Sequence, residues 1–156
     1  MRKRQIAAIP TALPIDRNWL KVDRIAVVEI TSEEAAHPVE AALVPGDERG
    51  WRAAGPGPQT IRLLFDHPQH LQGIWLRFEE TEIRRTQEFV LRWSVDAGQS
   101  YREIVRQQWN FSPPGTVREI EDYAVDLSGV TVLELSIVPS RSGAEARASL
   151  AALRLS

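Results

Sequence analysis

Residues 60–66 read Thr-Ile-Arg-Leu-Leu-Phe-Asp, and this stretch decides the fold class because its side chains alternate along an extended chain. Ile61, Leu63 and Phe65 face one way and Arg62 faces the other, as in a half-buried β-strand. The same alternation recurs in residues 74–79, 88–95, 123–127 and 133–137. Repeated short runs of this kind predict an all-β protein.

Turn residues separate these runs and predict antiparallel strands. The turn signals are Asp66-His67-Pro68, Asp96-Ala97-Gly98 and Ser128-Gly129, all rich in residues that favour turns. A parallel α/β fold would need crossovers of about a dozen residues or more, usually helical, and the sequence shows no such segments. The spacing therefore favours an antiparallel sandwich or barrel.

The remaining segments complete this reading as one domain over residues 1–156, with residues 1–20 as a lead-in segment. Residues 38–43 favour a helical turn, because proline suits the first turn of a helix. Residues 144–153 read more readily as a closing strand than as a helix. Loops are expected at residues 44–58, 96–100 and 110–116.

Length and composition exclude several classes of protein. The chain has 156 residues, of which 43% are hydrophobic and 26% charged, as is usual for one globular domain. A net charge of -2 argues against a nucleic-acid partner, and the lack of cysteine excludes disulfides and thiolate chemistry. Prolines at positions 10 and 14 interrupt any signal peptide. We expect a cytoplasmic protein without membrane contact, with secretion left open.

The order of these motifs resembles the galactose-binding-like family, the discoidin or coagulation-factor type C-like β-sandwich. Ile30-Thr31-Ser32-Glu33 follows the first strand, a helical turn spans residues 37–43, and a loop leads to Trp51. Later strands match at residues 88–94 and 149–155. The resemblance covers about residues 24–156 and implies a jelly-roll sandwich that acts as a binding module and not as an enzyme.

A narrower similarity, over residues 27–65, is to the N-terminal domain of the X-ray repair cross-complementing scaffold protein. The matching positions are Ser32-Glu33, His37, Ala41–Leu43, Trp51-Arg52-Ala53-Ala54 and Thr60-Ile61. The similarity implies the same general sandwich. It also keeps an accessory role in nucleic-acid repair open as a third, weaker alternative.

Carbohydrate binding is the activity that the family resemblance implies most directly. Binding sites for small molecules are concave, mostly apolar and aromatic, with a few convergent polar groups, and the chain contains five tryptophans. Trp51 corresponds to the structural tryptophan of the family, and Trp93 shares a face with Phe89 and Leu91. We therefore expect Trp51 and Trp93 to serve the core and not a ligand.

The candidate ligand-binding residues are Trp109, Asn110 and Phe111, together with Arg49 and Arg52 from the long loop. Two prolines follow Phe111 within a few residues and stiffen this part of the chain. Rigid presentation lowers the entropic cost of binding. Burial of both Trp109 and Phe111 would argue against this assignment.

The calcium site that the resemblance implies lacks its ligands at two positions, which are Val44 and Ala152. Calcium prefers six to eight oxygen ligands, and only Asp47 and Glu48 are available to compensate. We therefore expect no calcium, no other metal and no cofactor.

No catalytic residue is assigned. His67 and His70 have no third ligand nearby in the sequence, and we read them as a solvated turn. Glu119 and Glu121 flank Ile120 as on a solvated strand face. A paired-carboxylate site stays open in principle, but the sequence marks no pair.

The leading interpretation is a non-catalytic carbohydrate-binding module that binds glycan through loops at one end of the sandwich. The alternative is a protein–protein interaction or scaffold module of a multi-protein complex that uses a sheet face or loops. One sandwich fold hosts many functions, so the resemblance does not decide between a glycan and a protein partner.

Overall fold

A computed structural model of the chain describes residues 1–3, 17–143 and 145–156. Most of the expected lead-in segment, residues 4–16, lies outside the described residues. The elements are α1 (Val22–Ile25), β1 (Ala26–Ile30), α2 (Glu40–Leu43), β2 (Trp51–Pro56), β3 (Gln59–Glu79), β4 (Arg85–Ser94), β5 (Arg102–Phe111), β6 (Arg118–Val138), β7 (Arg147–Leu150) and β8 (Ala152–Leu155). The prediction of an antiparallel β-sandwich is confirmed. None of the helices in the described residues is long and apolar enough to cross a membrane.

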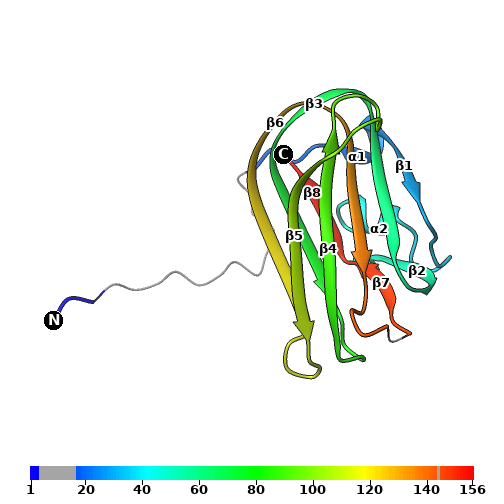
Figure 1. The fold of residues 1–156 in the computed structure, drawn as a ribbon, viewed down its shortest axis with the longest axis vertical. Helices are drawn as coiled ribbons and strands as arrows, with labels where there is room; N and C mark the ends of the chain where they lie inside the picture. The colour runs from blue at the N-terminus through cyan, green and yellow to red at the C-terminus, as the bar shows by residue number, and fades with distance from the viewer. Residues whose placement is uncertain (4–16, 144) are drawn as a thin grey trace.

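The two longest strands, β3 and β6, run through both layers of the sandwich (Figure 1). Residues 59–64 of β3 pair with residues 132–137 of β6 in the first layer, where the strand order is β1-β3-β6-β4-β5. Residues 71–79 of β3 pair with residues 118–127 of β6 in the second layer, where β8 also pairs with β3. Strands β2 and β7 form a separate small sheet.

The turns expected at residues 66–68 and 128–129 are wrong, because both are bends inside continuous strands. The register between β3 and β6 shifts between Leu64 and Gln69. Pro68, which has no N–H to donate, fits this interruption. Gly129 has a φ of 70°, a backbone conformation that glycine adopts without steric cost.

The boundaries of two expected loops also differ from the prediction. Strand β5, ten residues long, was not predicted. Its sequence shows no clear alternation, because each face of the strand carries polar as well as apolar side chains. The expected loop at 110–116 therefore begins only after Phe111. The expected loop at 44–58 ends early, because β2 starts at Trp51 and pairs with β7. The helical turn within 38–43 and the closing strands after residue 144 are confirmed.

The faces predicted from alternation form the core. Ile61 and Leu63 are each 1% exposed, and the rings of Phe78 and Phe89 stack across the two layers with centroids 5.1 Å apart. Burying a large apolar side chain stabilises the fold by roughly 1.5–3 kcal/mol. Trp51 is also 1% exposed, and its Nε1 donates a hydrogen bond of 3.0 Å to the carbonyl oxygen of Ser32. The expected structural role of Trp51 is therefore confirmed, whereas Trp93 is only half-buried against the core.

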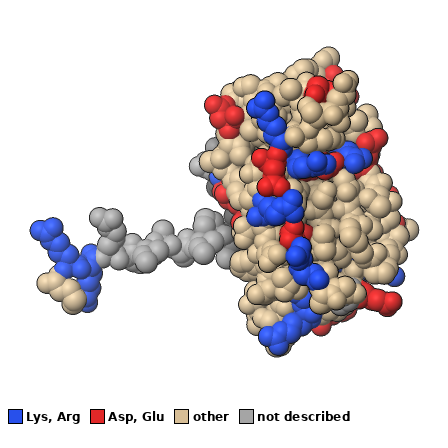
Figure 2. All heavy atoms as spheres, in the orientation of Figure 1, with Lys and Arg blue, Asp and Glu red and all other residues tan. Residues whose placement is uncertain are grey.

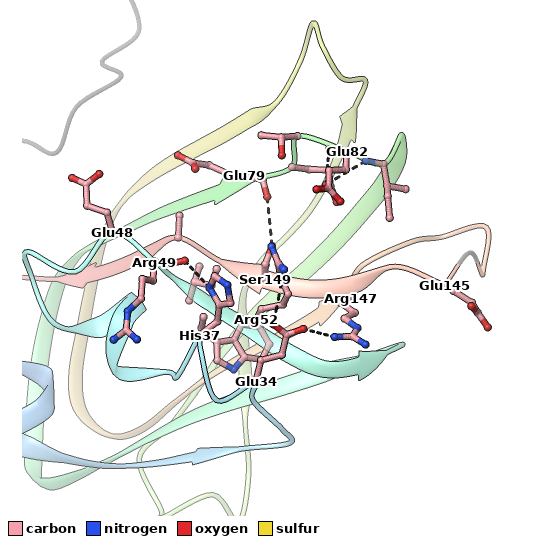
Figure 3. A pocket seen from close by; sticks show the side chains of 16 residues that line it. Glu34, His37, Glu48, Arg49, Arg52, Glu79, Glu82, Glu145, Arg147 and Ser149 are labelled. Carbon is pink, nitrogen blue, oxygen red and sulfur yellow. Dashed lines mark hydrogen bonds and ion pairs between the residues drawn. The ribbon is translucent and has the colours of Figure 1, made fainter.

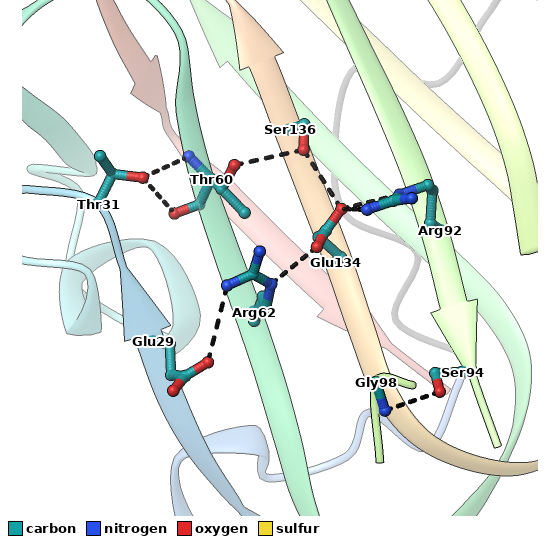
Figure 4. A network of polar contacts seen from close by, with 9 residues as sticks. All are labelled: Glu29, Thr31, Thr60, Arg62, Arg92, Ser94, Gly98, Glu134 and Ser136. Atoms are coloured by element: carbon teal, nitrogen blue, oxygen red, sulfur yellow. Dashed lines mark hydrogen bonds and ion pairs between the residues drawn. The ribbon is translucent and has the colours of Figure 1, made fainter. Parts of the chain in front are cut away.

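The outer face of the first layer carries a row of alternating charges across its strands. The strand registers align Glu29, Arg62, Glu134, Arg92 and Glu103 from β1 to β5. Arg62 Nε lies 2.8 Å from one carboxylate oxygen of Glu134, and Arg92 NH2 lies 2.6 Å from the other (Figure 4). Figure 2 shows a band of alternating positive and negative groups on the molecule, with broad uncharged areas beside it.

Glu134 is the centre of this row, with a side chain only 2% exposed. Burial by itself raises the pKa of this carboxyl group, but hydrogen bonds from Arg62 and Arg92 outweigh that effect and lower it. The carboxylate therefore stays charged and holds β3 and β4 in register on either side of β6.

Replacing Glu134 by alanine should lower the free energy of unfolding by about 2 kcal/mol, because two guanidinium groups would lose their shared partner. Urea denaturation measures this change. The control is Glu103→Ala, whose carboxylate lies at the exposed end of the row and should change stability by less than about 1 kcal/mol. Equal effects of the two substitutions would show that the row does not depend on Glu134.

Candidate functional site

A cleft of about 390 Å³ opens at the end of the sandwich where β3 turns into β4 (Figure 3). One wall comes from residues 34–52, the other from the loop at 79–83, and β7 closes the base. The lining is mainly charged and includes Glu34, His37, Arg49, Arg52, Glu79, Glu82 and Arg147.

Glu34 joins two arginines at the base of the cleft. Its carboxylate accepts a hydrogen bond from Arg147 and lies 3.9 Å from Arg52 NH1. Backbone bonds hold this segment against β2, because the Glu34 N–H donates to the Arg52 carbonyl and the Arg52 N–H donates to the His37 carbonyl. Both guanidinium groups stay about half exposed, so they keep N–H donors that face solvent.

Arg49 occupies the rim of the same wall. Its Nε and NH2 donate to Asp47, and these side-chain hydrogen bonds lower the pKa of Asp47 to about 2. His37 Nδ1 lies 3.0 Å from the Arg49 carbonyl oxygen. Gly50 follows with a φ of 69°, and a Cβ there would meet the Leu150 carbonyl oxygen at 3.0 Å. A glycine is therefore required for the loop to approach β7 this closely.

The opposite wall depends on Glu80. One carboxylate oxygen accepts the backbone N–H groups of Glu82 and Ile83 at 3.1 and 3.3 Å. The other accepts Arg85 Nε at 2.7 Å. This arrangement fixes the loop and leaves Ile83 42% exposed beside the cleft.

A buried polar cluster lies behind this wall, between the two layers. Arg85 NH1 donates to Gln87 Oε1 at 3.0 Å and to the Pro139 carbonyl at 2.8 Å, while its guanidinium lies 4.8 Å from the ring centre of Phe111. Gln87 Nε2 then donates to Glu119 at 3.3 Å.

The expectation that Glu119 lies on a solvated strand face is wrong, because this residue is 0% exposed. Glu119 and Glu121 do share one face of β6, as the alternation predicts. In the second layer, however, this face is turned toward the interior of the sandwich. Burial, with a further contribution from Glu121, raises the pKa of Glu119 to about 9. Glu119 therefore carries a proton at neutral pH.

A second, shallower surface of about 570 Å³ lies along β5, beside the turn that follows it. It is lined by Gln107, Gln108, Trp109, Asn110 and Thr116. Trp109 is half-buried, and Asn110 accepts a hydrogen bond of 2.7 Å from Thr86 Oγ1.

The five predicted ligand residues fall into three places. Arg49 and Arg52 line the cleft, and Trp109 and Asn110 line the shallow surface. Phe111 is 1% exposed and packs in the core under Arg85, so its ring is not accessible to a ligand. Sequence reasoning did not find Glu34 and Arg147, which lie more than a hundred residues apart and meet only through the pairing of β2 with β7.

The residues at the implied calcium site do not fit this ion. Val44 and Ala152 have no side-chain oxygen, and Asp47 is bound by Arg49. In addition, the buried guanidinium of Arg154 donates a hydrogen bond of 2.8 Å to the Ala42 carbonyl at the end of α2. This carbonyl, next to the residues of the implied site, already has a positively charged donor. The described residues contain no group of three or more His, Cys, Asp or Glu side chains placed to hold a metal.

Glu119→Gln should flatten the pH dependence of stability between pH 6 and 9. A carboxyl group whose pKa is raised in the folded state favours folding most when the pH is below its pKa in the unfolded chain, about 4.3. This contribution to stability is lost as the pH rises toward the pKa in the folded state. The melting temperature of the native chain should therefore fall as pH rises through this range, and that of Glu119→Gln should fall less. The exposed substitution Glu40→Gln is the control, and identical slopes in all three proteins would contradict the prediction.

No protein-family model matches the chain, and no curated protein matches its sequence. Solved structures do match its fold. CpGH89CBM32-5 from Clostridium perfringens, in complex with GalNAc-β-1,3-galactose, has a TM-score of 0.65 and 17% identity, covering 88% of this chain and 99% of the other. The family 32 carbohydrate-binding module of C. perfringens NanJ, in complex with galactose, has a TM-score of 0.61 and 14% identity, covering 88% of this chain and 96% of the other.

The structure of reduced XRCC1 bound to the DNA polymerase β catalytic domain also matches, with a TM-score of 0.60 and 15% identity, covering 85% of this chain and 95% of the other. Identities this low show a common fold. The expected resemblance is confirmed at that level, and the chain has the galactose-binding-like β-sandwich fold.

Proposed function

We propose that the chain is a non-catalytic carbohydrate-binding module and that the cleft holds the sugar. The observation that carries this proposal is the joint presence of half-exposed guanidinium groups, Arg52 and Arg147, and of carboxylates such as Glu34 and Glu79 in one recess. Sugar hydroxyls both donate and accept hydrogen bonds. A recess that offers charged donors and acceptors together is suited to them.

The size and the remaining lining support a small glycan. A volume of about 390 Å³ lies within the usual range for ligand sites. Ile83 gives an apolar contact for the C–H face of a pyranose ring. Trp51 lines the cleft but is buried, so ring stacking on this indole does not enter the proposal. Two neighbours in fold were solved with galactose-containing ligands.

In this proposal Trp109 and Asn110 give a second contact for a longer glycan. Their surface lies at the same end of the sandwich, because Glu80 in the cleft wall donates its N–H to the Val117 carbonyl just beyond it. Amide side chains beside a half-buried indole favour uncharged sugar units there.

The second candidate function is protein binding through β5, and it rests on a different observation. Among residues 17–143 and 145–156, β5 is the last strand in its layer and pairs with β4 alone. A free strand edge accepts an extended partner segment through backbone hydrogen bonds. The XRCC1 complex shows that a protein of this fold was solved with a protein partner.

A glycan array, run with and without EDTA, tests the proposed function. Binding should survive EDTA, and Arg52→Ala should weaken it about tenfold or more, because a charged hydrogen bond contributes roughly 1.5–3 kcal/mol. The matched control is Arg24→Ala, an exposed arginine in α1 away from the cleft.

Asn110→Ala separates the two surfaces. It should weaken binding of oligosaccharides while leaving a monosaccharide unaffected. A blank array from a chain that melts cooperatively would overturn carbohydrate binding and favour the protein-binding alternative.

A further inference from the structure

We infer that the protonation state of Glu119 controls the loop at residues 80–83, and with it the shape of the cleft. The loop movement itself does not depend on what the cleft binds. Its consequence for glycan affinity rests on the proposed function.

A continuous chain of hydrogen bonds connects the two places. Glu119 accepts from Gln87, Gln87 accepts from Arg85, and Arg85 donates to Glu80 at 3.3, 3.0 and 2.7 Å respectively. Glu80 in turn accepts the backbone N–H groups of Glu82 and Ile83. The connection therefore runs from the interior of the sandwich to the backbone of the cleft wall.

Arg85 interacts with two carboxyl groups, because it is hydrogen-bonded to Glu80 and its charge acts through space on Glu119. This double interaction makes the chain of hydrogen bonds a switch. Among the described residues, Arg85 NH2 and Glu119 Oε2 are both buried without a hydrogen-bond partner. While Glu119 is protonated it is neutral, and Arg85 remains paired with Glu80. Once Glu119 ionises, its buried carboxylate is separated from the buried guanidinium of Arg85 by the side chain of Gln87. A buried carboxylate is strongly destabilised unless it is paired with a positive charge.

We expect Arg85 to shift toward the ionised Glu119 and to release Glu80. The Glu80 side chain is at the edge of the interior, 15% exposed, so water can solvate it. The Glu80 carboxylate, no longer fixed by Arg85, then turns toward solvent and loses its hydrogen bonds with the N–H groups of Glu82 and Ile83. The loop therefore loses its fixed position. Ile83 would leave the cleft.

The other groups around Glu119 set the pH range of this switch. Glu121 on the same face of β6 makes ionisation of Glu119 harder, and burial raises the pKa of Tyr123 above its usual range, so Tyr123 stays neutral. From β5, the uncharged ring of Phe111 lies beside Arg85, and Trp109 is the strand partner of Gln87. With the pKa of Glu119 near 9, the loop is held at neutral pH and released in the alkaline range.

NMR titration of the intact chain from pH 6 to pH 10 tests the switch, with ¹³C label in glutamate carboxyl and isoleucine methyl groups. The Glu119 carboxyl and the Ile83 methyl should titrate with one midpoint. In Glu119→Gln the Ile83 titration should vanish. The matched control, Glu145→Gln, removes an exposed carboxylate at the cleft and should leave the midpoint unchanged.

The outcomes separate this inference from the proposed function. A constant Ile83 signal while Glu119 titrates would overturn the switch, as would an unchanged Ile83 titration in Glu119→Gln. If Glu119→Gln does not fold, the native chain alone gives the answer. Equal titration midpoints of the Glu119 carboxyl and the Ile83 methyl would support the switch, and different midpoints would overturn it. For any sugar found by the array, affinity should fall about tenfold between pH 7 and 10. A blank array would overturn the proposed function and leave the NMR result standing.

Discussion

The pairing of β3 with β6 holds the molecule together, because each strand belongs to both layers. Each strand has 21 residues, and the two strands pair first in one layer and then, after shifts in register, in the other. Every other strand of the two layers joins this pair directly or through β4. The crossing takes place where the register shifts after Leu64 and where Gly129 has a positive φ. As a consequence, the loop that follows β3 must lie at the far end of the second layer, where it forms a wall of the cleft.

Of three buried glutamates on this framework, two are ionised and one is protonated, because their partners differ. Glu134 lies between two arginines and stays ionised. Glu88, at the other end of the same face, is held in the ionised form by hydrogen bonds from Gln108 and Arg106. Within the described part of the chain, the one hydrogen-bond donor to Glu119 is the amide of Gln87, and a second glutamate lies beside it, so Glu119 keeps its proton. Solvation and available donors, and not residue type, decide the state of each carboxyl group.

The cleft and the interior of the sandwich are joined through Arg85. Its guanidinium closes the core above Phe111 and at the same time fixes the cleft wall through Glu80. A cleft wall fixed by such a residue has limited freedom to vary, because changes in the wall reach the core. The same connection gives the core a means to act on the site.

The sequence by itself determined the all-β class, the inward faces of the main strands and the core role of Trp51, since these follow from alternation and from local motif order. It also predicted a ligand role for Arg49 and Arg52, both of which line the cleft. Tertiary structure alone decided that Glu119 is buried, that Phe111 is inaccessible and that Glu34 meets Arg147. Alternation shows that two side chains share a face, but it does not show which layer covers that face. Contacts between residues far apart in the chain depend on strand pairing, which local sequence patterns do not encode.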